Sequence, residues 1–452
     1  MDEIPITGYA DRFSLAPGEK INFKISSTSN DPYRAKLIRV ISGDPNPEGP
    51  GLIEEDLESD FSGVYPSRRQ TTNLGSYVRV PSNNSFNPSE GFTIGATIWP
   101  TNITNIDQCI ISQFNSAHDA GMALFVGSKG VSIVVADGQN NQIRLSIDRP
   151  LSERRWYHIW ASFDLESSKL EICQTPVIDS FDLDSPLRKE ISCSTKPILI
   201  PQQPLIIGAA GNNKITNFFN GKIERPVFIN TAGNDEDALD IAKGANDTRI
   251  TAAWDFSKNI SSQEAVDISG NNFTGKIINL PTRAVKGFMW DGSYFDWTKK
   301  PEHYGAIHFH DDDLYDCEWE TDFSFQIPQN MDSGIYLMRI ECDGNKDAIP
   351  FFVCPPRGKR NADLCILIST FTYTVYGNHA RPDYSESWQE RIKEWGAYPY
   401  NAAEYKEYGL STYNFHSDGS GICYGSFKRP LFNLRPGYIT FGDSNCSGLR
   451  HF

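Results

Sequence analysis

The sequence has no segment of the kind that enters or crosses a membrane. No run approaches the roughly 18 consecutive apolar residues of a membrane-spanning helix. The longest apolar runs, Ser132–Ala136 and Leu364–Ile368, have the length of single strands. Residues 1–5 contain neither the basic region nor the apolar region of a secretory signal. These absences predict a soluble, cytoplasmic protein.

The sequence also has fewer basic than acidic residues, and it lacks closely spaced cysteine pairs. The chain has 42 Lys and Arg residues against 57 Asp and Glu, a formal net charge of −15. Because no basic surface is expected to dominate, we expect neither a nucleic acid nor an anionic membrane as a partner. The nine cysteines are thinly spread without a Cys-x-x-Cys pair, which argues against a disulfide scaffold or a structural zinc site. We therefore expect reduced thiols that pack as small core residues.

The chain is rich in aromatic residues and in short strand patterns. Its 452 residues, with 27 Phe, 19 Tyr and 9 Trp, are enough for about three domains with buried cores. Strand patterns at 20–26 and 35–41 open the chain. Two strands cannot bury a sheet face alone, so we expect later strands to complete an immunoglobulin-like β-sandwich built from residues 1–60 and 236–356. The later strands are expected at Phe323–Pro328, Gly334–Ile340 and Ile349–Cys354.

A jelly roll is predicted at residues 61–235, between the two parts of that sandwich. Ten short strands separated by Gly, Asn and Ser are typical of an antiparallel sandwich or jelly roll. They are expected at Gly75–Val80, Phe92–Trp99, Ile110–Phe114, Ala123–Gly127, Val131–Ala136, Gln142–Ile147, Trp156–Phe163, Lys169–Ile172, Leu205–Gly208 and Gly221–Phe228. The order of these segments resembles a laminin-G/concanavalin-like jelly roll. That resemblance implies a fold and no particular activity.

From residue 357 the pattern changes. The continuous apolar run Asp363–Ser369 predicts a strand buried on both faces. Ser385–Trp395 predicts a helix because its large apolar residues recur at i, i+4 and i+7, and Ala402–Tyr408 predicts another helical turn or two. Residues 357–452 are therefore expected to be the N-terminal part of an open-sheet α/β catalytic domain. That domain would be truncated, since its usual size is about 150 residues.

Two polar, aromatic segments in this region carry the candidate chemistry. Residues 369–379 follow the predicted strand, where open α/β sheets place their ligand sites. Residues 409–421 contain further tyrosine, histidine and aspartate. A phenolate oxygen is a hard anionic donor that suits ferric iron, so two tyrosines from these segments are candidate metal ligands. The ordinary alternative is that they pack and hydrogen-bond through their hydroxyls.

Four motifs in the second half of the chain resemble a known enzyme family. They are Trp290-Asp291-Gly292; Ile307–Tyr315; Thr370-Phe371-Thr372-Tyr373 with Tyr376 and Asn378; and Ser411–Gly421 followed by Arg429-Pro430. Their order resembles the large (beta) subunit of the N,N-dimethylformamidase family over nearly the whole chain. The resemblance implies a hydrolase that converts dimethylformamide to dimethylamine and formate. It also implies a small alpha subunit as partner and homo-oligomerisation.

The resemblance further implies a mononuclear, non-haem Fe³⁺ held by two tyrosines and a glutamate, with a histidine beside it. Tyr413 matches the second tyrosine, and Tyr373 is the choice for the first, with Tyr376 as its rival in the same motif. The glutamate and the histidine belong to a segment of the family beyond residue 452. Either the chain is a fragment, or another polypeptide completes the site.

The remaining side chains near the tyrosines are candidates for catalysis. With the metal polarising the amide oxygen or activating a bound water, Asn378 and His416 are the expected catalytic residues. Ser411 and Thr412 are further donors that would orient the substrate or stabilise the oxyanion. These roles depend on adjacency to the tyrosines in the sequence.

Three alternatives remain open. His308 and His310 share one face of a strand and, with Asp311–Asp313, are candidate ligands of another metal. The alternative is a polar loop with a solvated acidic run and structurally satisfied histidines. The protein as a whole is either an enzyme subunit or a non-catalytic sandwich protein that mediates binding or assembly. A relative acting on another small amide or a nitrile is the third possibility.

Overall fold

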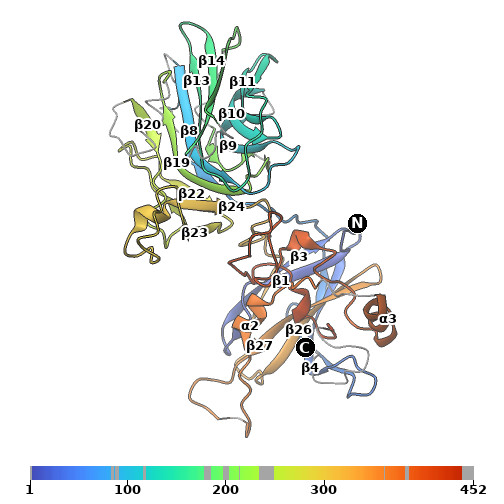
Figure 1. The fold of residues 1–452 in the computed structure, drawn as a ribbon. Coiled ribbons are helices and arrows are strands. Elements are labelled where there is room, and N and C mark those ends of the chain that lie inside the picture. Colours follow the sequence, from blue (N-terminus) through green and yellow to red (C-terminus); the bar gives the residue numbers. More distant parts are fainter. Residues whose placement is uncertain are drawn as a thin grey trace. The chain divides into compact units, whose positions relative to one another are not determined.

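The chain forms two compact units, here called the sandwich unit and the jelly-roll unit (Figure 1). The sandwich unit comprises Met1–Leu74, Leu314–Phe415 and Ser420–Phe452, and the jelly-roll unit comprises Gly75–Asp313 and His416–Gly419. The computed structural model describes residues 3–82, 86, 91–115, 119–177, 185–196, 203–212, 214–233, 249–360, 362–381 and 386–439.

The jelly-roll unit has two large sheets. The first has the order β12-β11-β10-β9-β16-β7-β22-β21, and the second has the order β15-β14-β13-β8-β19-β24-β23, with β20 paired to β19. The strands of the first are β7 (Tyr77–Val80), β9 (Gln108–Asn115), β10 (Ala120–Gly127), β11 (Gly130–Asp137), β12 (Gln142–Ser146), β16 (Leu205–Ile207), β21 (Glu264–Ala265) and β22 (Gly275–Ile278). Those of the second are β8 (Gly91–Pro100), β13 (Tyr157–Asp164), β14 (Lys169–Pro176), β15 (Leu187–Ser192), β19 (Gly221–Ile229), β20 (Ile250–Ala253), β23 (Thr282–Val285) and β24 (Ala306–Phe309). Two shorter elements, β17 (Ala210–Gly211) and β18 (Ile215–Thr216), form a separate ribbon, and η1 (Pro301–Tyr304) is a 3₁₀ turn.

Alternation along the strands builds the core between these sheets. On β13 every second side chain, from Tyr157 to Phe163, lies in the buried apolar cluster. The intervening residues point to the other face, as the two-residue period of a strand requires. All ten strands predicted between residues 75 and 228 are present, so this part of the fold prediction is confirmed.

Residues 250–309 belong to the same two sheets. Strand β22 pairs with β7, and β24 pairs with β19. The compact unit thus extends to Asp313, whereas the sequence pattern placed the end of the jelly roll at residue 235. The two ends of this insert meet, because the Gly75 backbone N–H donates to the Asp313 carbonyl at 2.9 Å.

A buried carboxyl group on β19 is expected to make the stability of the jelly-roll unit depend on pH. Glu224 accepts a hydrogen bond from the Phe288 backbone N–H at 2.8 Å. Its other carboxyl oxygen has no hydrogen-bond partner among the described residues. Burial raises the pKa of Glu224 from 4.5 to about 7, because removal from water disfavours the charged form.

The free energy of unfolding of the jelly-roll unit is expected to fall as pH rises from 4.5 to about 7. Across this window the folded state keeps a proton on Glu224 that the unfolded chain has released. The full effect is up to about 3 kcal/mol. The variant Glu224→Gln cannot ionise, so urea unfolding followed at several pH values should show a flatter profile than the wild type.

Asp137→Asn is the matched control. Hydrogen bonds from Asn141 and Gln139 lower the pKa of Asp137, so it is already ionised throughout the window and its replacement should leave the slope unchanged. Identical slopes in wild type and Glu224→Gln would contradict the assignment.

The sandwich unit joins strands from both ends of the chain. A three-stranded sheet has the order β1-β3-β25, and a six-stranded sheet has the order β2-β27-β26-β4-β5, with β6 paired to β4. The strands are β1 (Ile6–Ala10), β2 (Ser14–Leu15), β3 (Lys20–Ser27), β4 (Tyr33–Gly43), β5 (Leu52–Leu57), β6 (Gly63–Tyr65), β25 (Phe323–Gln326), β26 (Gly334–Cys342) and β27 (Asn345–Val353). The pairings of β3 with β25 and of β4 with β26 join early and late segments as expected. Phe23 lies at the centre of the core, with ring centroids 5.6 Å from Phe323 and 5.8 Å from Phe351.

The predicted buried strand at Asp363–Ser369 is wrong. Leu364, Ile366 and Leu367 are 88%, 80% and 90% exposed, and no strand is assigned there. A strand buried on both faces needs neighbouring strands and covering helices. Beyond Val353 the described residues provide no strand to pair with it. They form the α-helices α2 (Thr370–Val375) and α3 (Glu386–Trp395) and the 3₁₀ turns η2 (Lys406–Tyr408) and η3 (Phe432–Leu434).

The helix predicted at 385–395 is confirmed as α3, whose Trp388, Ile392 and Trp395 pack in one cluster. The eight cysteines in the described part of the chain are free thiols, and five of them are buried, as expected for small core residues. Among the described residues, no helix is both long and apolar enough to cross a membrane.

Candidate functional site

A pair of stacked tyrosines forms the candidate site of the sandwich unit. Tyr376 caps the C-terminal end of α2, and its ring stacks on that of Tyr413 with centroids 4.1 Å apart and planes 15° apart. A hydrogen bond with Tyr413 raises the pKa of Tyr376. The His379 ring lies 6.2 Å from Tyr376 and 6.0 Å from Tyr413. The two segments singled out in the sequence thus meet through their aromatic rings.

Tyr373 lies in a different environment. It packs against an apolar cluster that includes Phe352, Leu431 and Leu434, and burial raises the pKa of its hydroxyl. It also lines an apolar hollow of about 110 Å³. Of the two tyrosines that the sequence left as rivals, Tyr376 is therefore the one that the structure brings to Tyr413.

Asn378 holds the backbone of this region in place. It is 1% exposed and adopts a left-handed conformation with φ of 59°. Its Nδ2 donates to the carbonyls of Tyr408 and Pro430 at 3.2 and 2.9 Å, and its Oδ1 accepts from the Phe432 N–H at 2.9 Å. Because the amide is committed to backbone groups, Asn378 positions the segment that carries Tyr376.

Arg429 ties the two tyrosine segments together. Its Nη2 donates to the Gly377 carbonyl at 3.1 Å and to the Leu410 carbonyl at 3.0 Å, and its Nη1 donates to the Tyr408 carbonyl at 3.1 Å. Burial lowers the pKa of the Arg429 guanidinium to about 10. The sequence pattern included Arg429 in a motif and gave no reason for it. The contacts show that it fixes the chain on either side of the tyrosine pair.

Ser411 and Thr412 shape the turn that presents Tyr413. The Ser411 hydroxyl accepts from the Tyr413 N–H at 3.0 Å and donates to Asn414 Oδ1 at 3.2 Å. The Thr412 hydroxyl donates to the Val375 carbonyl at 2.9 Å. Both hydroxyls therefore help to place Tyr413 beside the end of α2.

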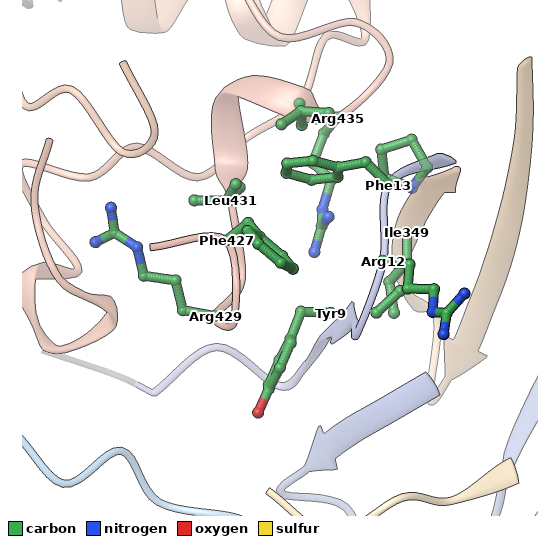
Figure 2. Close-up of a pocket in the computed structure, with 11 residues that line it drawn as sticks. Tyr9, Arg12, Phe13, Ile349, Phe427, Arg429, Leu431 and Arg435 are labelled. Atoms are coloured by element: carbon green, nitrogen blue, oxygen red, sulfur yellow. The ribbon is translucent and has the colours of Figure 1, made fainter. Parts of the chain in front are cut away.

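A small cavity lies elsewhere in the same unit. Figure 2 shows Tyr9, Phe13 and Ile349 facing Phe427 and Leu431 around it. It measures about 20 Å³, which is room for one water molecule. Neither Tyr376 nor Tyr413 lines it.

In the jelly-roll unit, three histidines and two aspartates meet in a buried cluster, here called the His/Asp centre. Its members are His308, His310, Asp313, His416 and Asp418. The side chains of His310 and Asp418 are 1% and 0% exposed. The predicted solvated acidic run is wrong for Asp313, whose side chain is 8% exposed. Asp418 comes from a distant segment, so sequence spacing gave no sign that it joins the two histidines at the end of β24.

The contacts in the His/Asp centre are short. His308 Nε2 lies 3.2 Å and His310 Nε2 lies 3.8 Å from Asp418 Oδ2. His310 Nδ1 lies 3.2 Å from Asp313 Oδ2. The His310 and His416 rings stack with centroids 3.7 Å apart. His/Asp groups in this arrangement are able to hold a metal ion.

The protonation of these histidines depends on their surroundings. Burial lowers the pKa of His308 to about 4, against the opposing hydrogen bond to Asp418, so His308 is neutral at pH 7. Burial also favours neutral His416. Its hydrogen bond with Asp312 and the carboxylates of Asp313 and Asp418 outweigh this, and the pKa of His416 is raised. His416 was expected at the tyrosine site, and the structure places it in the jelly-roll unit.

Two family models match different parts of the chain. The family described as N,N-dimethylformamidase beta subunit-like, C-terminal, matches residues 282–449. The concanavalin A-like lectin/glucanases superfamily matches residues 71–238. Among solved structures, the SAP-like pentraxin of Limulus polyphemus has a TM-score of 0.28 and 9% identity, over 46% of this chain and 82% of the pentraxin.

Two relatives align with nearly the whole chain. The N,N-dimethylformamidase beta subunit of Paracoccus aminophilus is 35% identical over 96% of this chain, and that of an Alcaligenes species is 34% identical over 96%. The chain spans 61% of the length of each relative. The resemblance to the N,N-dimethylformamidase beta subunit, with a concanavalin-like jelly roll inside the chain, is thereby confirmed.

Proposed function

We propose that this chain is the large subunit of an iron-dependent amidase that hydrolyses a small N-alkylated amide, with dimethylformamide yielding dimethylamine and formate. The observation that carries the proposal is the stacking of Tyr376 on Tyr413 at 4.1 Å. Both belong to motifs that match the dimethylformamidase-like family across residues 282–449. A small alpha subunit and homo-oligomerisation are part of the same proposal.

The residues present fit a ferric ion in their donor chemistry. Two phenolic oxygens on adjacent rings are hard donors of the type that Fe³⁺ prefers. A hydrogen bond with Tyr413 raises the pKa of Tyr376, so each hydroxyl would have to release its proton for the two phenolates to hold the ion. Tyr376 and Tyr413 supply two ligands. The remaining ligands, a glutamate and a histidine in the proposed site, come from another segment or polypeptide.

Tyr376 and Tyr413 would hold the iron, and the ion would supply a Lewis acid able to polarise the amide carbonyl or a water molecule. Other residues of the chain hold the two tyrosines in position. Asn378 and Arg429 fix the backbone on both sides of the pair, so the two hydroxyls keep one relative position. His379, whose ring lies 6.0 Å from Tyr413, is placed to exchange a proton near them, and we assign it the role first expected of His416.

The test uses the protein as it is made in the cell, purified with its small subunit. We expect about one iron per chain by elemental analysis and equimolar release of dimethylamine and formate from dimethylformamide. Hydrolysis of acetamide or a nitrile in preference to dimethylformamide would overturn the substrate. Absence of iron together with absence of hydrolysis would overturn the function and favour a binding or assembly protein.

A further inference from the structure

We infer that the His/Asp centre of the jelly-roll unit is a site for a divalent first-row metal ion such as Zn²⁺, bound by His308 Nε2, His310 Nε2 and Asp418 Oδ2. One ligand atom from each of these three residues lies within 4.8 Å of the other two. The site is independent of the tyrosine pair in its residues and its unit. Imidazole nitrogen and carboxylate oxygen are the usual donors for such ions.

The placement of the ligands follows from the strand. His308 and His310 are two residues apart where β24 ends, so their side chains lie on one face. Ring centroids 4.2 Å apart confirm that the two imidazoles are neighbours. Asp418 enters from the segment His416–Gly419 of the same unit, and its carboxylate faces both rings.

The spacing of the donor atoms matches a metal site. In a tetrahedral zinc site with bonds of about 2.0–2.1 Å, neighbouring ligand atoms lie about 3.3 Å apart. The separation of His308 Nε2 from Asp418 Oδ2 is 3.2 Å, and that of His310 Nε2 from Asp418 Oδ2 is 3.8 Å. Three protein ligands leave a fourth position for water or a substrate group.

The outer contacts orient the ligands as metal sites require. His310 Nδ1 lies 3.2 Å from Asp313 Oδ2, so the other ring nitrogen, Nε2, is the one nearer to Asp418. Such carboxylate–histidine pairs accompany most metal-bound imidazoles. Asp313 is itself held by the Ser76 hydroxyl at 2.6 Å, and Asp418 by the Thr101 hydroxyl at 2.6 Å.

A plain hydrogen-bond network explains this arrangement less well. His308 Nε2 lies 3.2 Å and His310 Nε2 lies 3.8 Å from Asp418 Oδ2, and the second distance is too long for a hydrogen bond. Two imidazoles also converge on the same oxygen, Asp418 Oδ2. One proton bridges one pair of atoms, whereas a metal ion bridges all three.

The consequence of metal binding is local order. The ion links the end of β24 to residues 416–418, which hydrogen bonds already hold at Thr101 and at Asp312. Its free energy of binding adds to the stability of this unit, because the unfolded chain does not bring the three ligands together.

The test is a metal titration of the purified full chain with its small subunit, stripped by chelator and reloaded with Zn²⁺ or Co²⁺. We expect uptake of about one ion per chain in addition to any iron, and a higher unfolding temperature on loading. His308→Gln and Asp418→Asn should each reduce this uptake to less than about a tenth. His158→Gln is the matched control, because His158 lies on β13 of the same unit and bonds to Thr97.

The outcomes separate the two metals. Tyr413→Phe should leave zinc uptake unchanged, and His308→Gln should leave the iron content unchanged. Zinc-edge X-ray absorption of the loaded wild type keeps the test decisive if a variant does not fold, since it should show two imidazoles in the first shell. Any of three results would overturn the inference. These are no zinc uptake by the wild type, as much zinc uptake by His308→Gln as by the wild type, and an X-ray absorption spectrum that shows only oxygen ligands around the zinc.

Discussion

Replacing Tyr413 with phenylalanine should remove iron from the purified protein and lower kcat for dimethylformamide hydrolysis by more than about 100-fold. The loss of an outer contact to a metal costs about 10- to 100-fold in affinity or activity, and Tyr413 is a proposed direct ligand, so its loss should exceed that range. Tyr376→Phe should behave in the same way, because the two rings stack at 4.1 Å. Elemental analysis and product release measure both effects.

Tyr373→Phe is the matched control. It removes a hydroxyl from the same helix, yet Tyr373 packs in the apolar cluster with Phe352 and Leu434. We expect wild-type iron and nearly wild-type kcat. If Tyr373→Phe loses iron while Tyr376→Phe keeps it, the choice that the family resemblance first made would be right and the structural pairing wrong.

Arg435→Met is expected to lower the free energy of unfolding of the sandwich unit by about 3–5 kcal/mol, the usual cost of breaking a buried ion pair. The Arg435 guanidinium bonds both oxygens of Asp347 at 2.8 and 2.9 Å and also the Gly8 carbonyl at 2.6 Å. The two side chains are 2% and 0% exposed. Without the arginine, the Asp347 carboxylate stays buried beside the neutral donor Thr7 and loses its charged partner.

Arg12→Met provides the comparison for this prediction. Figure 2 shows Arg12 and Arg435 in the same view of the sandwich unit, but Arg12 pairs with Glu19 at 3.8 Å and its side chain is 51% exposed. An exposed pair contributes about 0–1 kcal/mol. The double variant Arg435→Met with Asp347→Asn should recover part of the loss, because the unpaired charge is gone. A loss of under about 1 kcal/mol in Arg435→Met would show that the pair does not stabilise the unit.

The strands were predictable because each carries its own pattern. Apolar residues alternate with polar ones at residues 20–26, and short apolar runs recur in the jelly roll. Such patterns reflect burial of one or both faces of a strand, and the structure has strands at these positions. The strand predicted at Asp363–Ser369 is wrong because its pattern alone does not supply neighbouring strands. Its apolar run has the composition of a buried strand, but a strand forms only with partners, and the described residues beyond Val353 contain no strand to provide them.

The candidate sites were likewise predictable only where the residues lie in local sequence motifs. The tyrosine segments could be found from their motifs, whereas the choice between Tyr373 and Tyr376 depended on which side of α2 meets the turn at Ser411. The His308 and His310 pair was visible at a spacing of two. Asp418 lies 110 residues from His308, and only the three-dimensional fold brings the two together.

The meeting of Gly75 with Asp313 bears on how the chain folds. Pairing β3 with β25 closes a loop of roughly 300 residues, and the entropy cost of a flexible loop grows with its length. Once the insert has folded, its two ends lie one hydrogen bond apart, so only residues 23–75 and 313–323 remain in the loop to be closed, about a fifth of the original length. Folding of the jelly-roll unit thus lowers the entropy cost of pairing early and late strands in the sandwich unit. We expect those strands to pair after the jelly-roll unit has formed.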